Sequence, residues 1–292
     1  MRSAASRGIA KFALLCWCSV GSTALGHGDL HEKIEVLDAL LKQNPDHVAS
    51  LLERADIHRR HRNFDDALED LNRLRSLAPT NNTVYYMTGL TLLEQGEFEE
   101  AETALRTFIS RSPSSPRGHI ALAKVLTQQK RHLDAAQEYE LAIENQSIPT
   151  PDHYLARAHA YMEAGKPYLA RALQGLEDGM ALMGPLLTFH RLAIEIEIAQ
   201  EDFQNAIDRI NMILHEADRK ETWLVKKAKV LSSMGRNEEA RQQFLLAERA
   251  IALLPHRTRT SPAIQTLRKT IQEHLNHEPQ EENVQNESDI RP

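Results

Sequence analysis

Apolar residues recur at helical spacing along most of the chain, in pairs of stripes separated by short polar breaks. In one segment, Tyr85, Gly89 and Leu92 follow one another at intervals of four and three residues, which places them on one face of a helix. A break at Gly96 interrupts this stripe, and a second apolar stripe follows. Pro113 ends the second stripe, because proline lacks the amide hydrogen that a helix interior requires. The pattern predicts helix-turn-helix units, and no stretch alternates as a strand would.

This unit recurs with a nearly constant period. Proline returns at intervals of 34 residues, at Pro45, Pro79 and Pro113. Alanine returns at intervals of 34 to 36 residues, at Ala67, Ala101, Ala135, Ala170, Ala206 and Ala240. A second set of small residues lies where the first helix of each pair must approach the second closely: Ala55, Gly89, Ala123 and Ala158. Since a lone hairpin of this size cannot bury both stripes, we expect the pairs to stack and to share a continuous core.

A helix-turn-helix period of 34 residues with small residues, alanine and proline at these offsets resembles the tetratricopeptide repeat (TPR). The resemblance covers roughly residues 30–255 and is closest over residues 46–113. Lys130 and Glu201 stand where the family has glycine, and Pro167 stands where it has an aromatic residue. The resemblance implies an all-α fold, a right-handed α-solenoid of about six TPR-like repeats.

Both ends of the repeat array carry signals for an additional helix. The segment 29–32, which begins at Asp29, reads as a capping box that opens a helix running to about Asn44. At the other end, Ser261 followed by Pro262 predicts the start of a C-terminal capping helix. Its apolar stripe is Ile264, Leu267, Ile271 and Leu275. We therefore expect one helical repeat domain over residues 27–277.

The first 26 residues differ in composition from the rest of the chain. They carry Arg2, Arg7 and Lys11, then a short apolar run over residues 12–20, then small residues before His27. This is the pattern of a secretory signal peptide. It predicts export from the cytoplasm, to the periplasm or outside the cell, with no stable membrane span. Residues 278–292 are acidic and poor in apolar residues, and we expect them to be a disordered tail.

Composition restricts the chemistry. The formal net charge of −6 argues against a nucleic-acid partner, and both cysteines lie within the predicted signal peptide. No glycine-rich phosphate loop, nucleophile elbow or zinc-protease motif occurs, so we expect no enzyme and no cofactor. Among the fourteen histidines, His119 and His190 occupy the positions of Tyr85 and Tyr154, which predicts that both fill the core.

The TPR resemblance implies a binding surface on the concave face, formed by recurring positions of the first helices. At these positions the chain carries the residues that we expect to bind a partner: Leu52, Arg59, Tyr86, Leu90, Arg117, Lys124, His159, Arg191 and Lys229. Their mixture of cations and apolar groups suits an extended peptide or a polar partner segment. Asp56 and Leu90 stand where some relatives place the asparagine of a clamp for chaperone C-termini, so that specificity is not expected. The predicted function is a non-catalytic protein-protein interaction scaffold.

Two other functions remain open at this stage. If the signal peptide is cleaved after Gly26, the new amino terminus at His27 and the nearby His31 could bind Cu²⁺ or Zn²⁺, as in a metal-binding envelope protein. The chain could also be an accessory subunit of an envelope enzyme. The dense basic run over residues 58–62 suits either an anion or, more simply, the negative end of a helix.

Overall fold

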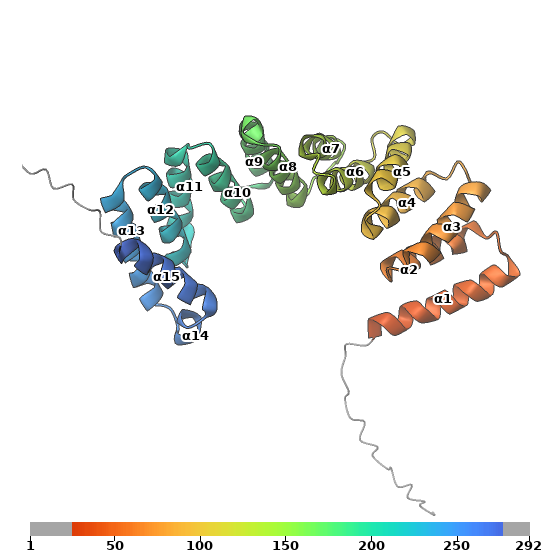
Figure 1. Ribbon diagram of the computed structural model, residues 1–292, viewed down its shortest axis with the longest axis horizontal. Coiled ribbons are helices and arrows are strands. Elements are labelled where there is room, and N and C mark those ends of the chain that lie inside the picture. Colours follow the sequence, from red (N-terminus) through yellow and green to blue (C-terminus); the bar gives the residue numbers. More distant parts are fainter. Residues whose placement is uncertain (1–24, 277–292) are drawn as a thin grey trace, which may run out of the picture. The chain divides into compact units, whose positions relative to one another are not determined.

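The computed structural model describes residues 25–276 of the chain. This part of the chain contains fifteen α-helices, one 3₁₀ helix and no strand (Figure 1). The predicted signal peptide, apart from its last two residues, and the predicted acidic tail lie outside the described residues. Within residues 25–276, no helix combines the length and the apolar character needed to cross a bilayer.

Twelve of the helices in this part of the chain are first and second helices in alternation along the sequence, as the 34-residue period predicts, and we call each first helix and the helix that follows it a pair. The first helices of the pairs are α2 (Val48–Arg60), α4 (Asn82–Gln95), α6 (Pro116–Gln128), α8 (Pro151–Glu163), α10 (Leu187–Ala199) and α12 (Glu221–Ser233). The second helices are α3 (Phe64–Leu77), α5 (Phe98–Arg111), α7 (His132–Glu144), α9 (Leu169–Met183), α11 (Phe203–Glu216) and α13 (Asn237–Ala252). The chain is an all-α solenoid of TPR-type helix pairs.

The chain divides into two compact units, and the boundary falls between Gly96 and Glu97. In the first unit, α1 (Leu25–Gln43) packs on α2, α2 on α3, and α3 on α4. Their core contains Leu51, Leu71 and Leu74, together with Val84 of α4. Ala55 and Ala67 are completely buried where α2 and α3 approach each other, which confirms the predicted role of these small residues.

In the second unit each helix from α5 to α13 packs on the next one along the chain. The predicted close-contact alanines Ala123, Ala135 and Ala206 are completely buried. At the carboxyl end, the short helix α14 (His256–Arg259) leads into α15 (Pro262–Asn276). Ile264 and Ile271 of α15 are buried against α12 and α13, so α15 is the predicted capping helix.

The tight turns inside the pairs adopt a left-handed conformation that usually requires glycine. Gly96 and Gly235 have φ angles of 100° and 74° there. Arg62, Lys130 and Glu201 hold the equivalent positions with φ angles of 64°, 59° and 63°. The turn is therefore preserved without glycine at three positions, each at a cost in backbone energy.

Two local predictions were wrong. Ala170 is exposed, and Ala172 is buried in its place at 1% exposure. The reason is the 3₁₀ helix η1 (Lys166–Tyr168), which lengthens the turn of the fourth pair and shifts the register of α9 by two residues. The first helix also begins at Leu25 rather than at the predicted cap Asp29, because no proline before Asp29 stops the helix from extending.

Candidate functional site

The predicted partner-binding residues fall into two classes of exposure. Leu52, Arg59, Tyr86 and Leu90, all in the first unit, are half-buried. The five in the second unit are exposed: Arg117, Lys124, His159, Arg191 and Lys229.

In the first unit, Arg59 is held by carboxylates of its own chain. Its guanidinium donates to Asp56, one turn earlier in α2, at 2.8 Å, and to Glu94 at the end of α4. Although it is half-buried, these carboxylates keep the pKa of Arg59 above its usual value. Arg60 pairs with the same Asp56 at 2.6 Å. Arg59 and Arg60 are therefore paired within the first unit, and a partner would have to displace these contacts to use Arg59.

In the second unit, four exposed side chains lie on successive first helices: Lys124 of α6, His159 of α8, Arg191 of α10 and Lys229 of α12. We call them the first-helix set. None of the four forms an ion pair within residues 25–276. Three of them directly follow a buried alanine, so their positions on their helices are equivalent.

The surroundings of the first-helix set carry both charges. Glu195, one turn after Arg191, pairs with Lys226 of the next first helix at 3.3 Å. The positive charge of Lys124 acts on His153 of α8, where it adds to burial in lowering the pKa of that imidazole, against the opposite effect of Asp152.

The histidines expected in the core are buried, which confirms that prediction, but both make polar contacts. His119 lies 2.7 Å from a carboxylate oxygen of Glu138 and 2.7 Å from the carbonyl oxygen of Pro113. His190 accepts a hydrogen bond at Nδ1 from Arg209 at 3.3 Å. Sequence periodicity located these histidines but gave no sign of their partners.

The candidate metal site is untested. His31 is exposed on α1, and the side chain of His27 lies outside the described part of the structure. In the described residues, no group of three or more histidine, cysteine or acidic side chains could hold a metal ion.

Sequence reasoning missed two features. One is a pair of half-buried or buried arginines, Arg54 and Arg157, at equivalent positions of the first and fourth pairs. The other is an apolar pocket between α10, α11 and α12. Its available signal was Leu187, which is an exposed apolar residue at the start of its helix, whereas the corresponding apolar residue of the first pair, Val48, is half-buried.

Comparison with known proteins agrees with this architecture. Residues 21–82 and 86–148 match the family model described as tetratricopeptide repeat. A search of curated proteins gave no significant match.

Three solved structures share the fold. The C-terminal part of a TPR repeat-containing protein from Cytophaga hutchinsonii is 14% identical, with a TM-score of 0.65, and the match covers 82% of this chain and 95% of that one. A tetratricopeptide repeat protein from Parabacteroides merdae is 18% identical, with a TM-score of 0.51, over 84% of this chain and 93% of that one. A Naa15/Naa10 complex bound to HypK-THB matches 86% of this chain and 38% of its own, at 16% identity and a TM-score of 0.56. Residues 21–82 and 86–148 thus match the tetratricopeptide repeat family, and the helices that continue to α13 share the fold of solved tetratricopeptide repeat proteins.

Proposed function

We propose that the protein is a non-catalytic scaffold that binds a partner protein or peptide through the first-helix set. The observation that supports this most directly is that Lys124, Arg191 and Lys229 are exposed and form no ion pair within residues 25–276. Three such cations and His159, one on each of four successive first helices, suit an extended acidic segment.

Stability and binding use different faces of these helices. The buried alanines and the apolar stripes hold the pairs together, whereas the side chains of the first-helix set contribute little to packing. Exposed charge pairs of this kind mainly increase the rate and specificity of association, and salt screens them. Binding to the proposed partner should therefore weaken as ionic strength rises.

Export is the second part of the proposal. The composition of residues 1–26 supports a signal peptide, with release to the periplasm or outside the cell. The partner would then be an envelope or extracellular protein.

Partner binding is tested by affinity capture from the native envelope fraction with two variants of equal charge change. One carries Lys124→Glu, Arg191→Glu and Lys229→Glu in the first-helix set. The control carries Lys220→Glu, Arg249→Glu and Arg257→Glu, three other exposed cations of the same unit. The first variant should lose the protein that the parent captures, and the control should keep it. Equal capture by both variants would contradict the proposed surface.

Export is tested by expressing the full chain in a Gram-negative bacterium and sequencing the amino terminus of the protein released by osmotic shock. We expect a sequence that begins at His27. An intact Met1 on protein that stays in the cytoplasm would exclude the signal peptide.

A further inference from the structure

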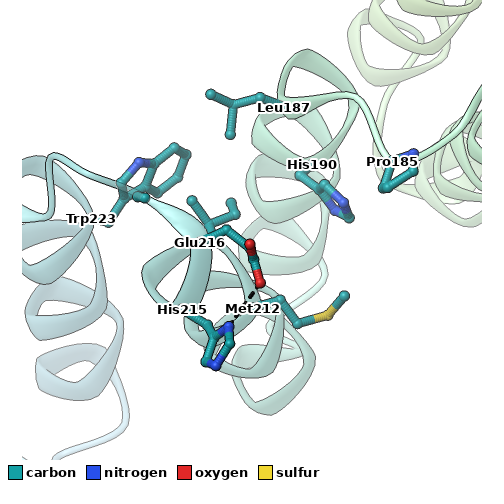
Figure 2. A pocket seen from close by; sticks show the side chains of 9 residues that line it. Pro185, Leu187, His190, Met212, His215, Glu216 and Trp223 are labelled. Carbon is teal, nitrogen blue, oxygen red and sulfur yellow. Dashed lines mark hydrogen bonds and ion pairs between the residues drawn. The ribbon is translucent and has the colours of Figure 1, made fainter.

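A pocket of about 700 Å³ opens where the fifth helix pair meets the sixth. Leu187 contributes from the start of α10 and Pro185 from the turn before it. Met212 and Ile213 contribute from the end of α11, and Trp223 from the first turn of α12 (Figure 2). In the view of Figure 2, Trp223 and His190 lie on opposite sides, with Leu187 above them. This volume lies within the range of roughly 300–1,000 Å³ that is usual for small-molecule sites.

The walls of the pocket are mainly apolar, and some of them are open to solvent. Leu187 is 53% exposed and Met212 is 60% exposed, although both are large hydrophobic residues. Trp223 packs partly against the core of the fifth pair and also lines the pocket. Apolar surface held open to water in a concave site is stabilised when an apolar molecule covers it.

One buried polar group lines this pocket without a complete set of partners. His190 is only 8% exposed. Arg209 approaches its Nδ1, and because a guanidinium can only donate, Nδ1 must accept. Burial, with the positive charge of Arg209, lowers the pKa of His190, so the ring is neutral at pH 7 and carries its hydrogen on Nε2. Among the described residues, no hydrogen bond reaches Nε2.

The buried cation near the pocket already has its counter-ions. Arg209 donates to Glu177 at 2.6 Å and to Glu197 at 2.7 Å, so it offers no free positive charge to an anion. At the rim, the carboxylate of Glu216 lies 2.8 Å from His215, and both side chains are exposed to water. An anion would therefore lose its hydration without gaining a counter-ion, and a cation could pair only with a hydrated carboxylate at the rim, which is a weak interaction. These contacts favour an uncharged ligand.

We propose that this pocket is a binding site for a small, uncharged, mainly apolar molecule that carries one hydrogen-bond acceptor. The apolar part of the molecule covers Trp223, Leu187 and Met212, and its acceptor oxygen receives the hydrogen of His190 Nε2. This site is separate from the first-helix set, so it stands whether or not the proposed partner binding is correct.

The test uses the full chain with Trp17→Phe, in which Trp223 is the only tryptophan. The indole N–H of Trp223 gives a single resonance in a ¹⁵N-¹H NMR spectrum. Acetophenone is the probe with an acceptor, and ethylbenzene is the probe without one. We expect both to shift the resonance saturably. Absence of a saturable shift with acetophenone would overturn the proposal.

The hydrogen bond is isolated with His190→Phe, which keeps a ring but removes the donor. For each protein we divide the dissociation constant of acetophenone by that of ethylbenzene, because this ratio removes most of the effect that the substitution has on apolar contacts with both probes. We expect the ratio to be roughly three- to tenfold larger for His190→Phe than for the parent, as the loss of one neutral hydrogen bond to acetophenone predicts. An unchanged ratio would overturn the assigned role of His190.

A second variant keeps the test valid if His190→Phe fails to fold. Met212→Glu alters an exposed residue, so the fold should tolerate it, but it places a charge in the apolar pocket. Leu182→Glu is the matched control, at a residue of α9 that is 63% exposed and does not line the pocket. Met212→Glu should abolish the saturable shift and Leu182→Glu should keep it. Equal binding by the two variants would place the probes elsewhere.

Discussion

The first and fourth helix pairs carry an arginine at the same position, but only the arginine of the first pair has carboxylate partners. Arg54 of α2 and Arg157 of α8 each stand directly before the buried alanine of their helix, Ala55 and Ala158. Arg54 donates to Asp70 of α3 at 2.6 and 2.8 Å and to Asp38 of α1 at 2.6 Å. Hydrogen bonds to Asp70, which is only 3% exposed, are the main reason that the pKa of Arg54 is raised.

Arg157 is more deeply buried and lacks such partners. It is 8% exposed, and its Nη2 has no hydrogen-bond partner within residues 25–276. The residue of α9 that corresponds to Asp70, three positions after the close-contact alanine, is Gly175. A Cβ atom on Gly175 would lie 2.2 Å from Nη2 of Arg157, so the guanidinium fills the space that the glycine leaves. The Tyr154 ring, with its centroid 5.2 Å from the Arg157 Cζ, is a weaker partner than a carboxylate.

The second carboxylate is present in the fourth pair but has other partners. Glu140 of α7 corresponds to Asp38, seven positions before the end of the preceding repeat. It accepts hydrogen bonds from Tyr161 at 3.1 Å and Arg171 at 3.3 Å. In the fifth pair, Arg209 of α11 stands where the first pair has Asp70, and it pairs with the buried Glu197. The repeats thus share their apolar contacts, but the partners of their buried polar side chains differ from one repeat to the next.

Removing the charge of the buried carboxylate in the first pair should have a large effect. Asp70→Asn removes one of the two hydrogen bonds from Arg54, because the amide nitrogen cannot accept, and weakens the other, so we expect it to lower the free energy of unfolding by about 2–3 kcal/mol. Urea denaturation measures this change. The control is Asp46→Asn, which breaks an exposed pair with Arg73 and should cost about 0.5 kcal/mol. Equal losses from the two substitutions would mean that the Arg54 network does not stabilise the first pair.

An intermediate effect is expected when the fourth pair receives the missing carboxylate. Gly175→Asp places it beside Arg157, whose flexible guanidinium must move to make room. Gly175→Asn has the same shape and no charge. We expect Gly175→Asp to be more stable than Gly175→Asn by about 1 kcal/mol, by urea denaturation at pH 7. A less stable Gly175→Asp would show that Arg157 already has a counter-ion.

The smallest expected effect is the pH dependence of stability, and it comes from two histidines in the fourth and fifth pairs. Burial lowers the pKa values of His153 in α8 and His190 in α10 below 6.5. The unfolded chain therefore binds more protons than the folded chain just below pH 6.5, and stability falls as pH decreases there. Urea denaturation at pH 7.5 and 5.5 should show this fall, and a His153→Gln, His190→Gln double variant should show a shallower one. An equally steep fall in the double variant would assign it to other groups.

The sequence predicted the features that depend on local apolar pattern. The 34-residue period located six helix pairs, and buried alanines such as Ala101 and Ala135 lie where the period placed them. The period failed at Ala170, because an irregular turn at residues 166–168 changes the register without changing the apolar pattern strongly. A prediction from periodicity assumes a constant turn length, and the residues of this turn do not indicate that it is longer than the others.

Polar contacts between side chains of different helices could not be predicted from the sequence. Nothing in the pattern shows that Arg54 meets two carboxylates whereas Arg157 meets none, because both positions look the same along their helices. The pocket near Trp223 likewise arises from three helix ends that only the fold brings together. The partner-binding residues of the first-helix set were located by the family resemblance, and their exposure agrees with that prediction without testing it.

The contrast between the two arginines is tested most directly by one substitution made at both positions. Arg54→Met leaves Asp70 buried without its partner and should lower the free energy of unfolding by about 2–4 kcal/mol. Arg157→Met replaces a buried guanidinium that has no carboxylate with an apolar side chain, and should raise the free energy of unfolding by about 1 kcal/mol. Opposite signs in parallel urea titrations are the predicted result. A loss of similar size at both positions would contradict the account.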